Sequence, residues 1–407
     1  MKKPFLILVI LFTFSIGFSQ SKTVEKDRII EDLNEIIQNL SRYYIYLEEK
    51  NVDLNCIKTH YQKRIDTLKT EEDTVLFFEY LLDEFYDNHL TLTTHRNSSF
   101  RLFAPIYTVF ENGKWIISQV WQTNIEKLPY NLIDAEIIKI NDIDFQIAIE
   151  NFPTCCQDKK NKEVREWIAN KTLAGRYNNK RVITLRLSDL RIVKLDLDLI
   201  KLKNHTKLLT SKIMKDVGVI RINNSLGNDN LVTEFDKELG KLLDTKGIII
   251  DLRNTVFGGD SYEARGIMSR FINEPKPYQK HSFIATSPNN PNIERSWVEY
   301  VTPRLETYKK PILILVGRWT GSMGEGLAIG FEGMKRGPVV GTKMRRLAGE
   351  VYDFSFKHQR YKYKIATTKL FHLNGTLRED YIPTHYIKQT TTQRDEILEK
   401  AIKLIIK

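Results

Sequence analysis

The feature that most constrains the fold of this 407-residue sequence is an alternation of short apolar runs with helically spaced segments from about residue 212 onward. The runs GIIIDL (247–252) and ILILV (312–316) have the length and composition of buried strands. Between them, apolar residues recur at helical spacing over 231–242 and again in SYEARGIMSRFI (261–272). Buried strands that alternate with helices imply βαβ units around a parallel sheet. The sequence therefore predicts an α/β domain in this half of the chain.

A glycine-flanked serine stands at the end of one of these strands. Ser322 lies in GRWTGSMGEG (317–326), where ILILV passes into a predicted helix, and the loop RNTVFGGD (253–260) follows the neighbouring strand. In parallel sheets, sites form at the carboxyl ends of strands. Serine and glycine are ordinary turn and cap residues. A serine at a helix N-terminus, beside free backbone N–H groups, is also placed to act as a nucleophile.

Acyl transfer by a serine requires a base for its proton and donors for the oxyanion. The N–H of Met323 is one candidate donor, and the Gly258-Gly259 pair permits the close backbone approach that a second donor requires. Eight histidines are present as candidate bases, and His89 lies where a predicted helix ends and an alternating strand begins. The serine turn is not the G-x-S-x-G elbow of α/β-hydrolases, because Thr320 occupies its first position.

Two further regions precede the α/β domain, which we expect to span 208–407. Residues 20–98 predict a helical region, because apolar residues recur at helical spacing without an interrupting proline. Residues 99–207 predict a compact, mostly β module with a hairpin turn at 112–113 and a tight turn at 141–142.

The N-terminus and the charge bear on location and partners. The first residues, MKKPFLILVILFTFSIGFSQ, combine two lysines, an apolar core and small residues near the end, so 1–19 predicts a cleaved signal peptide. We therefore expect an exported protein, periplasmic or secreted, without an integral membrane segment after cleavage. The net charge of +11 comes from basic residues scattered singly or in pairs, which argues against nucleic-acid binding. No spacing of ligand residues predicts a metal site.

The three cysteines predict a limited disulfide pattern. Export places Cys56, Cys155 and Cys156 in an oxidising compartment. Adjacent cysteines seldom bond to each other, because the ring is strained, so Cys56 is able to pair with either neighbour. The odd count leaves at least one thiol outside an intrachain disulfide.

Four stretches occur in an order that is specific in combination: LLDEFYDNHLTL, GIIIDLRNTVFGGDSYEARGIM, TGSMGEGLAIGFEGMKRGPVVGT and NGTLREDYIP. Together they resemble the tail-specific (C-terminal processing) serine peptidases, on the tricorn-like branch. The resemblance covers most of the chain. It implies an α/β fold in which a helical lead and a PDZ-like module precede a ClpP/crotonase-like catalytic domain. It also implies that Ser322 is the nucleophile and that Gly258 or Gly259 joins Met323 in the oxyanion hole.

The same resemblance assigns the base. The lysine that one branch of the family uses falls at Leu347 here, which excludes a Ser–Lys mechanism. The tricorn-like branch uses a histidine in a D-x-H-like motif, which matches His89, and a late glutamate that matches Glu379. Asn88 stands where some members have a serine that links the histidine to that glutamate. The resemblance implies that Asn88 and Glu379 orient and support the imidazole.

These inferences predict an exported serine peptidase without metal or cofactor. It would cleave extended, unstructured polypeptide segments, admitted by β-augmentation at the edge of the module. The loop TKMRRLAGE (342–350) departs from the family by being bulky and basic, and Arg345 and Arg346 either face solvent or meet a substrate carboxylate. Two alternatives stay open: a catalytically inactive peptide-binding scaffold on the same fold, and an esterase that uses the same serine. The sequence does not predict the oligomeric state.

Overall fold

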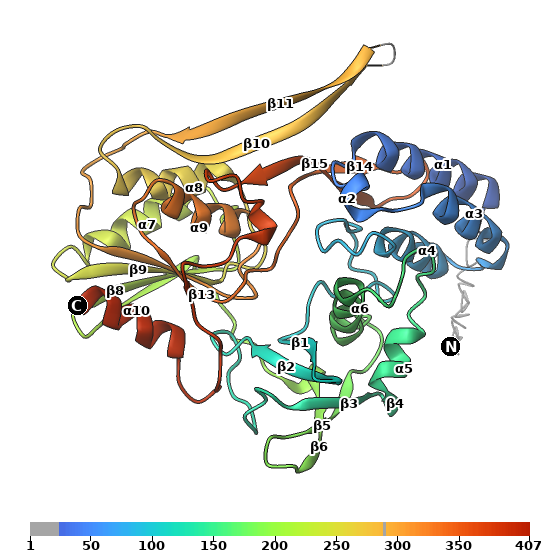
Figure 1. Ribbon diagram of the computed structural model, residues 1–407, viewed down its shortest axis with the longest axis horizontal. Helices are drawn as coiled ribbons and strands as arrows, with labels where there is room; N and C mark the ends of the chain where they lie inside the picture. The colour runs from blue at the N-terminus through green and yellow to red at the C-terminus, as the bar shows by residue number, and fades with distance from the viewer. Residues whose placement is uncertain (1–23, 288–289) are drawn as a thin grey trace, which may run out of the picture.

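The computed structural model describes residues 24–287 and 290–407, so the expected signal peptide at 1–19 lies outside the described residues. Figure 1 shows a helical region, a β module beneath it, and a layered α/β region on the opposite side of the molecule. Within the described ranges, no helix combines the length and the apolar character that crossing a membrane requires.

The α/β region is built on a six-stranded sheet with the order β16-β13-β12-β9-β8-β7. All neighbouring strands are parallel except β7, which is antiparallel to β8. The apolar runs that predict strands form β9 and β12, in which every residue is buried. The strands are β7 (Leu209–Met214), β8 (Val217–Asn223), β9 (Gly247–Asn254), β12 (Ile312–Val316), β13 (Val339–Gly341) and β16 (His385–Tyr386).

Helices cover both faces of this sheet, which explains why its strands are continuously apolar. Helices α7 (Leu231–Gly240), α8 (Ser261–Met268) and α9 (Met323–Gly333) lie on one face, and α10 (Glu396–Ile406) lies on the other (Figure 1). Side chains alternate between two cores: Ile250 packs with the α7–α9 side, whereas Ile249 packs with α10.

The β module is a second sheet with the order β1-β2-β3-β5-β6, and β4 pairs with β3. Its first turn carries Asn112 at φ 50° and Gly113 at φ 76°. This is the left-handed pair that a tight hairpin requires, so the predicted turn is present. The elements are β1 (Ile106–Glu111), β2 (Lys114–Val120), β3 (Glu136–Ile140), β4 (Ile143–Asp144), α5 (Phe145–Glu150), α6 (Lys162–Ala174), β5 (Val182–Arg186) and β6 (Ile192–Asp196).

The helical region comprises α1 (Lys26–Tyr43), α2 (Leu47–Lys50), α3 (Leu54–Arg64) and α4 (Glu71–Asp83). A disulfide between Cys56 in α3 and Cys156 in the module ties the two regions together, and Cys155 is free. The structure thereby selects one of the two pairings that the sequence leaves open.

A third sheet, with the order β11-β10-β15-β14, was not indicated by the sequence patterns. Strands β10 (Lys276–Ser287) and β11 (Asn290–Val301) form a long hairpin that projects along the top of the molecule (Figure 1). Strands β14 (Glu350–Ser355) and β15 (Lys362–Phe371) run to the helical region, where Tyr363 and Ile365 pack with Leu33 and Phe78. The helical region therefore shares its core with residues from the C-terminal half of the chain.

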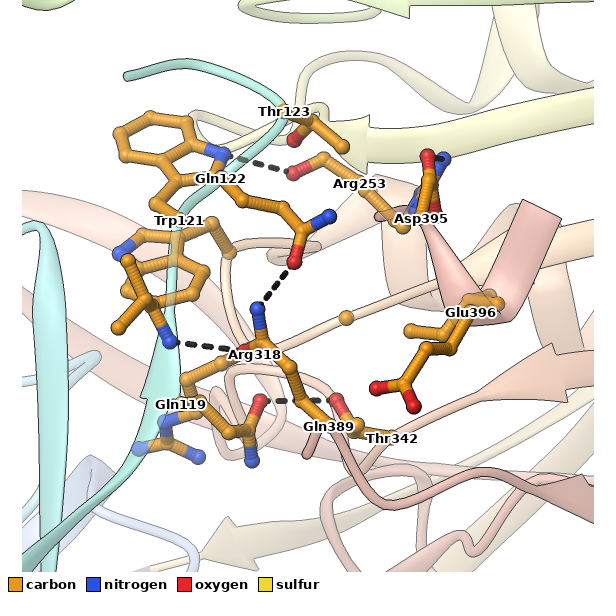
Figure 2. A pocket seen from close by; sticks show the side chains of 14 residues that line it. Gln119, Trp121, Gln122, Thr123, Arg253, Arg318, Thr342, Gln389, Asp395 and Glu396 are labelled. Atoms are coloured by element: carbon orange, nitrogen blue, oxygen red, sulfur yellow. Dashed lines mark hydrogen bonds and ion pairs between the residues drawn. The ribbon is translucent and has the colours of Figure 1, made fainter. Parts of the chain in front are cut away.

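The β module docks directly beside the predicted nucleophile turn. Trp121, at the end of β2, stacks on Trp319, with ring centroids 5.4 Å apart and an interplanar angle of 3°. The indole N–H of Trp319 donates to the carbonyl of Ala104 at 3.1 Å. Figure 2 shows the adjoining contacts, in which the Thr342 hydroxyl donates to Gln119 Oε1 at 2.8 Å. The segment that leads into the Ser322 turn and the start of the loop after β13 are thus both fixed to the module.

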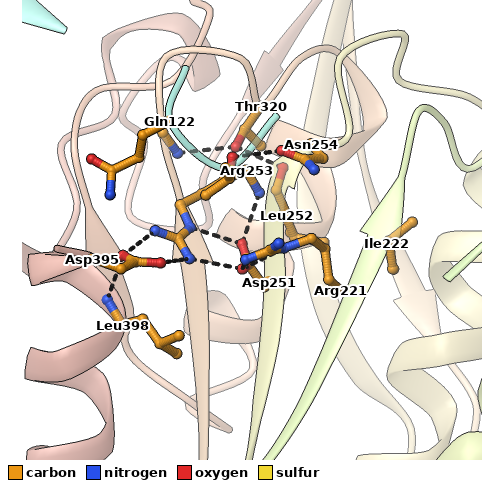
Figure 3. Close-up of polar contacts among 12 residues, drawn as sticks. Gln122, Arg221, Ile222, Asp251, Leu252, Arg253, Asn254, Thr320, Asp395 and Leu398 are labelled. Carbon is orange, nitrogen blue, oxygen red and sulfur yellow. Dashed lines mark hydrogen bonds and ion pairs between the residues drawn. The ribbon is translucent and has the colours of Figure 1, made fainter. Parts of the chain in front are cut away.

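A buried ionic network fixes the end of β9 (Figure 3). Asp251 accepts from Arg221 and Arg253, and Arg253 also donates to both carboxylate oxygens of Asp395, at 2.6 and 2.9 Å. Burial opposes ionisation of Asp251, but the two guanidinium groups hold its pKa well below its ordinary value. Because Asp395 is the N-cap of α10, the network joins the C-terminal helix to the strand that leads into the 253–260 loop.

Candidate active site

Ser322 occupies a strained turn between β12 and α9. Its backbone has φ 50° and ψ −118°, a conformation that residues with a Cβ rarely adopt. Such outliers cost roughly 1–3 kcal/mol and persist where the surrounding structure enforces them, often at functional sites. Here the turn is enforced by hydrogen bonds from Gly321 N–H to the Thr255 carbonyl and from Gly324 N–H to the Gly321 carbonyl. The side chain of Ser322 is therefore held at the start of α9.

Gly258 lies against this serine. Its φ is 68°, and a Cβ at this position would come within 2.4 Å of Ser322 Cβ and 2.9 Å of both Ser322 Oγ and Met323 N. Gly259 instead packs against the chain at Leu226. In the described part of the chain, the N–H groups of Met323, Gly258 and Gly259 have no acceptor. Gly258 is thus the glycine of the pair that approaches the serine directly.

Glu325 anchors the serine turn to a distant loop. Its carboxylate accepts from the backbone N–H of Ser322 at 2.9 Å, of Arg346 at 2.7 Å and of Leu347 at 3.2 Å. The side chain is fully buried, and burial raises its pKa although these donors favour the charged form. The S-x-x-E spacing marks a helix start in sequence, but it does not reveal that the glutamate also fixes the 342–350 loop.

The same loop orients His89. Nδ1 of His89 lies 2.9 Å from the carbonyl oxygen of Ala348. Because a carbonyl only accepts, Nδ1 carries the proton, and Nε2 of the neutral ring presents a lone pair. Burial, together with the nearby cation of Arg378, lowers the pKa of His89 to about 3. The histidine is therefore neutral throughout the physiological range of pH.

The arginines of the loop are structural rather than solvated. Arg345 is buried and donates to the carbonyls of Val256 and Leu102, and desolvation lowers its pKa to about 10. Arg346 donates to Asp380 at 2.9 Å. From the sequence, these side chains were expected either to face solvent or to contact a substrate carboxylate. In the structure, they instead form hydrogen bonds that hold the loop in place.

The predicted residues meet in one cavity of about 460 Å³. His89 and Ser322 both line it, although no hydrogen bond joins them in the described part of the chain. Catalytic hydrogen bonds are often longer in the free enzyme than in its complexes. The sequence-predicted residues that line this cavity are Asn88, His89, Gly259, Ser322 and Met323, and Gly258 contacts Ser322 from the neighbouring loop position.

Glu379 lies elsewhere. It lines a neighbouring cavity, of about 620 Å³, which shares Asn88 with the first. Burial raises the pKa of Glu379, and its Oε2 is buried without a hydrogen-bond partner among the described atoms. Within the described chain, neither Asn88 nor Glu379 hydrogen-bonds to the imidazole, and Nδ1 instead contacts the carbonyl oxygen of Ala348.

The edge of the β module is closed at the position where β-augmentation is expected. β1 is an edge strand, and Asn170 of α6 accepts from the Thr108 N–H at 3.0 Å and donates to the Thr108 carbonyl at 2.9 Å. Both outward backbone groups of Thr108 are therefore occupied by one side chain. An added strand would have to displace Asn170, so the expected docking at this edge is not supported at β1.

The ligand-type cluster found among the described residues does not suit a metal. It consists of Glu84, Cys155 and Cys156. The sulfur of Cys156 is committed to the disulfide, and the Glu84 carboxylate accepts from the backbone N–H groups of both cysteines. We assign it no metal.

Models of two known protein families match parts of this chain. A model of peptidase family S41 matches residues 216–377, and a model of the tricorn protease C1 domain matches residues 28–83. Residues 216–377 are a peptidase family S41 domain. The resemblance to tail-specific peptidases of the tricorn-like branch and the class of serine-type peptidase are thereby confirmed. No curated protein sequence matches the chain.

Solved structures share the fold over nearly the whole chain. Mature CPAF complexed with lactacystin matches with a TM-score of 0.63 at 14% identity, over 93% of this chain and 98% of that chain. The photosystem II D1 C-terminal processing protease matches with a TM-score of 0.54 at 12% identity, over 90% of this chain and 94% of that chain. A putative peptidase from Parabacteroides merdae matches with a TM-score of 0.55 at 14% identity, over 93% of this chain and 97% of that chain. At these identities the likeness concerns the fold alone.

Proposed function

We propose that this protein is an exported serine peptidase that cleaves unstructured polypeptide segments, with Ser322 as nucleophile and His89 as base. The observation that carries the proposal is the strained Ser322 turn, pressed against Gly258, in one cavity with a neutral imidazole. The Nδ1 contact with Ala348 leaves Nε2 of that imidazole available to accept a proton.

The proposed reaction uses groups that are already in place. Ser322 Oγ attacks the scissile carbonyl carbon while its proton passes to His89 Nε2. The N–H groups of Met323 and Gly258 donate to the resulting oxyanion. When the C–N bond breaks, the proton moves from Nε2 to the leaving amine, and an acyl-enzyme remains. Water then attacks the ester and loses a proton to the same imidazole; when the acyl C–O bond breaks, that proton passes to Ser322 Oγ and the acid product leaves.

Support for the imidazolium is the second part of the proposal. The carbonyl of Ala348 orients the ring, and we assign Asn88 and Glu379 a weaker, electrostatic role across the wall between the two cavities. By the same family analogy, the β module is proposed to be PDZ-like and the catalytic core ClpP/crotonase-like. Export is proposed from the N-terminal sequence, and N-terminal sequencing of protein purified from its native host tests it, since an intact Met1 would refute cleavage.

Fluorophosphonate labelling tests the chemistry. We expect the wild-type protein to be labelled and Ser322→Ala to be inert. His89→Asn should be labelled at least about 100-fold more slowly, because a general base contributes about 10²–10⁴-fold. Ser261→Ala is the matched control, because Ser261 is a second serine that lines the same cavity but has no assigned role in the reaction, and its labelling rate should be unchanged.

Two results would redirect the assignment. If labelling survives in His89→Asn at the wild-type rate, another group is the base. If folded wild-type protein is not labelled at all, the chain is a peptide-binding scaffold on the peptidase fold. Comparing matched ester and peptide substrates separates the peptidase from an esterase that uses the same serine.

A further inference from the structure

The cavity that holds Ser322 has a second set of polar side chains that the proposed chemistry does not use. We call Gln279, His281, Glu299 and Glu350 the acceptor wall, and all four line the cavity. They come from three strands: Gln279 and His281 from β10, Glu299 from β11 and Glu350 from β14. Gln279 and Glu299 are directly paired across the β10–β11 ladder.

The imidazole of His281 lies between the two carboxylates. Nε2 is 3.7 Å from Glu299 Oε1, and Nδ1 is 3.6 Å from Glu350 Oε2. The ring stacks on Trp297, with centroids 4.8 Å apart. The Glu299 and Glu350 side chains are 25% and 40% exposed, so a ligand in the cavity is able to reach both.

A buried acceptor in this wall lacks a donor. Gln279 is 2% exposed, its Nε2 lies 3.0 Å from His281 Nε2, and its Oε1 has no hydrogen-bond partner among the described atoms. A Cβ at Gly326 would lie 3.0 Å from this oxygen and 2.7 Å from Met323 Cε, which places Oε1 at the first turn of α9. Leaving such an oxygen unpaired costs about 1–3 kcal/mol, which a donor on a ligand would recover.

The charges of the wall are not neutralised by lysine or arginine. Among the described residues, no such side chain forms an ion pair with Glu299 or Glu350. The neighbouring imidazole of His281 is the largest effect that lowers the pKa of Glu350, and the charge of Arg378 contributes, so this carboxylate is ionised at neutral pH. The nearby Arg378 donates to the carbonyls of Leu347 and Gly349.

The remaining cations of the cavity lie at the His89 end. Arg345 is buried and bonded to backbone carbonyls, and Lys364 acts on the pKa of His89. The cavity is therefore polarised, with cations around the imidazole of His89 and, at the base of the hairpin, two carboxylates that accept from the hydroxyls of Tyr278 and Tyr352 but from no lysine or arginine.

We propose that the acceptor wall is a specificity subsite for a basic side chain, lysine or arginine, close to the scissile bond of the polypeptide substrate. The proposal rests on the proposed peptidase function. An ammonium or guanidinium group would donate to the partly exposed carboxylates of Glu299 and Glu350, with Gln279 Oε1 as a further acceptor in the same wall, and charge-assisted bonds are about twice as strong as neutral ones. The indole of Trp297, stacked on His281, holds this imidazole between the two carboxylates.

Matched peptides test the subsite. Each peptide of a series places lysine, arginine, norleucine or glutamate at one position near the cleaved bond, and kcat/KM is measured for each. We expect lysine or arginine to exceed norleucine by at least about 10-fold at one position. Glu350→Gln and Glu299→Gln should each reduce that ratio several-fold, and Glu350→Lys should favour glutamate. Glu294→Gln, on the outer part of β11 where it accepts from Ser282, is the matched control and should preserve the ratio.

Binding separates this proposal from the catalytic one. The affinities of the lysine and norleucine peptides for Ser322→Ala are measured by fluorescence anisotropy, which requires no cleavage. A lysine preference that disappears in the Ser322→Ala, Glu350→Gln double variant supports the subsite even if the wild type proves inactive. Equal affinities and equal kcat/KM at every position, or a preference for glutamate in the wild type, would overturn the subsite. Fluorophosphonate labelling of Ser322 in the wild-type protein would then leave the peptidase assignment intact.

Discussion

Lowering the pH should destabilise this protein through His89 in particular. Its side chain is 9% exposed, and burial, reinforced by the charge of Arg378, holds its folded-state pKa at about 3. In the unfolded chain the pKa returns to about 6.5. The unfolded state therefore binds a proton that the folded state does not take up. The stability associated with neutral His89 is fully present above about pH 6.5 and is lost progressively as the pH falls toward 3.

The size of this effect follows from the two pKa values. At about pH 5 the unfolded imidazole is almost fully protonated, about 1.5 pH units below its pKa, while the folded one is still neutral. At 1.36 kcal/mol per unit, the folded state should lose about 2 kcal/mol relative to neutral pH. A loss of about 2 kcal/mol is a substantial part of the free energy of unfolding of a typical folded domain, which is roughly 5–15 kcal/mol.

Urea unfolding of wild-type protein and His89→Asn at about pH 7.5 and 5 measures this contribution. The asparagine amide keeps a donor for the Ala348 carbonyl but does not titrate. Buried carboxyl groups with raised pKa, such as Glu325, titrate in both proteins and cancel in the comparison. We expect the wild type to lose about 2 kcal/mol more than the variant. Equal losses would mean that His89 titrates normally in the fold, and the argument for a buried, neutral base would fail.

Three further predictions concern the turn, the disulfide and the ionic network. Gly258→Ala should slow fluorophosphonate labelling of Ser322 about 100-fold or more, because the new Cβ overlaps the serine; an unchanged rate would exclude the close approach. Cys56→Ser should lower the free energy of unfolding by about 2–5 kcal/mol, since its disulfide closes a long loop, whereas Cys155→Ser should change it by less than about 0.5 kcal/mol. Asp395→Ala should cost about 2–4 kcal/mol in urea unfolding, because a buried guanidinium loses a partner and α10 loses its N-cap; a cost below about 1 kcal/mol would refute that role.

Local patterns in the sequence were sufficient for the elements around the serine. Strands β9 and β12 are continuously apolar because helices cover both faces of their sheet, and this signature is visible without the structure. The hairpin turn at 112–113 has the left-handed φ values that its residue types favour. The S41 match at 216–377 lies in the part of the chain where these patterns are strongest.

Pairing between segments that are distant in the sequence could not be predicted from such local patterns. Strands β10, β11, β14 and β15 were not predicted; β10 pairs with β15 from a distant part of the chain, and β14 and β15 pack against the helical region. The basic loop at 342–350 looked solvated, since sequence gives no sign that backbone carbonyls would satisfy Arg345.

The sequence by itself determined the serine turn, whose glycines and flanking strand and helix are neighbours in the chain. Only the tertiary structure decided what surrounds that turn, because Glu325 reaches the backbone of the 342–350 loop and the same loop presents its Ala348 carbonyl to His89. It also shows a backbone oxygen, that of Ala348, at Nδ1 of the imidazole, a contact that the sequence did not predict. A backbone carbonyl is offered by every residue, so no residue type marks it in a sequence, and only the folded chain shows which one meets the histidine.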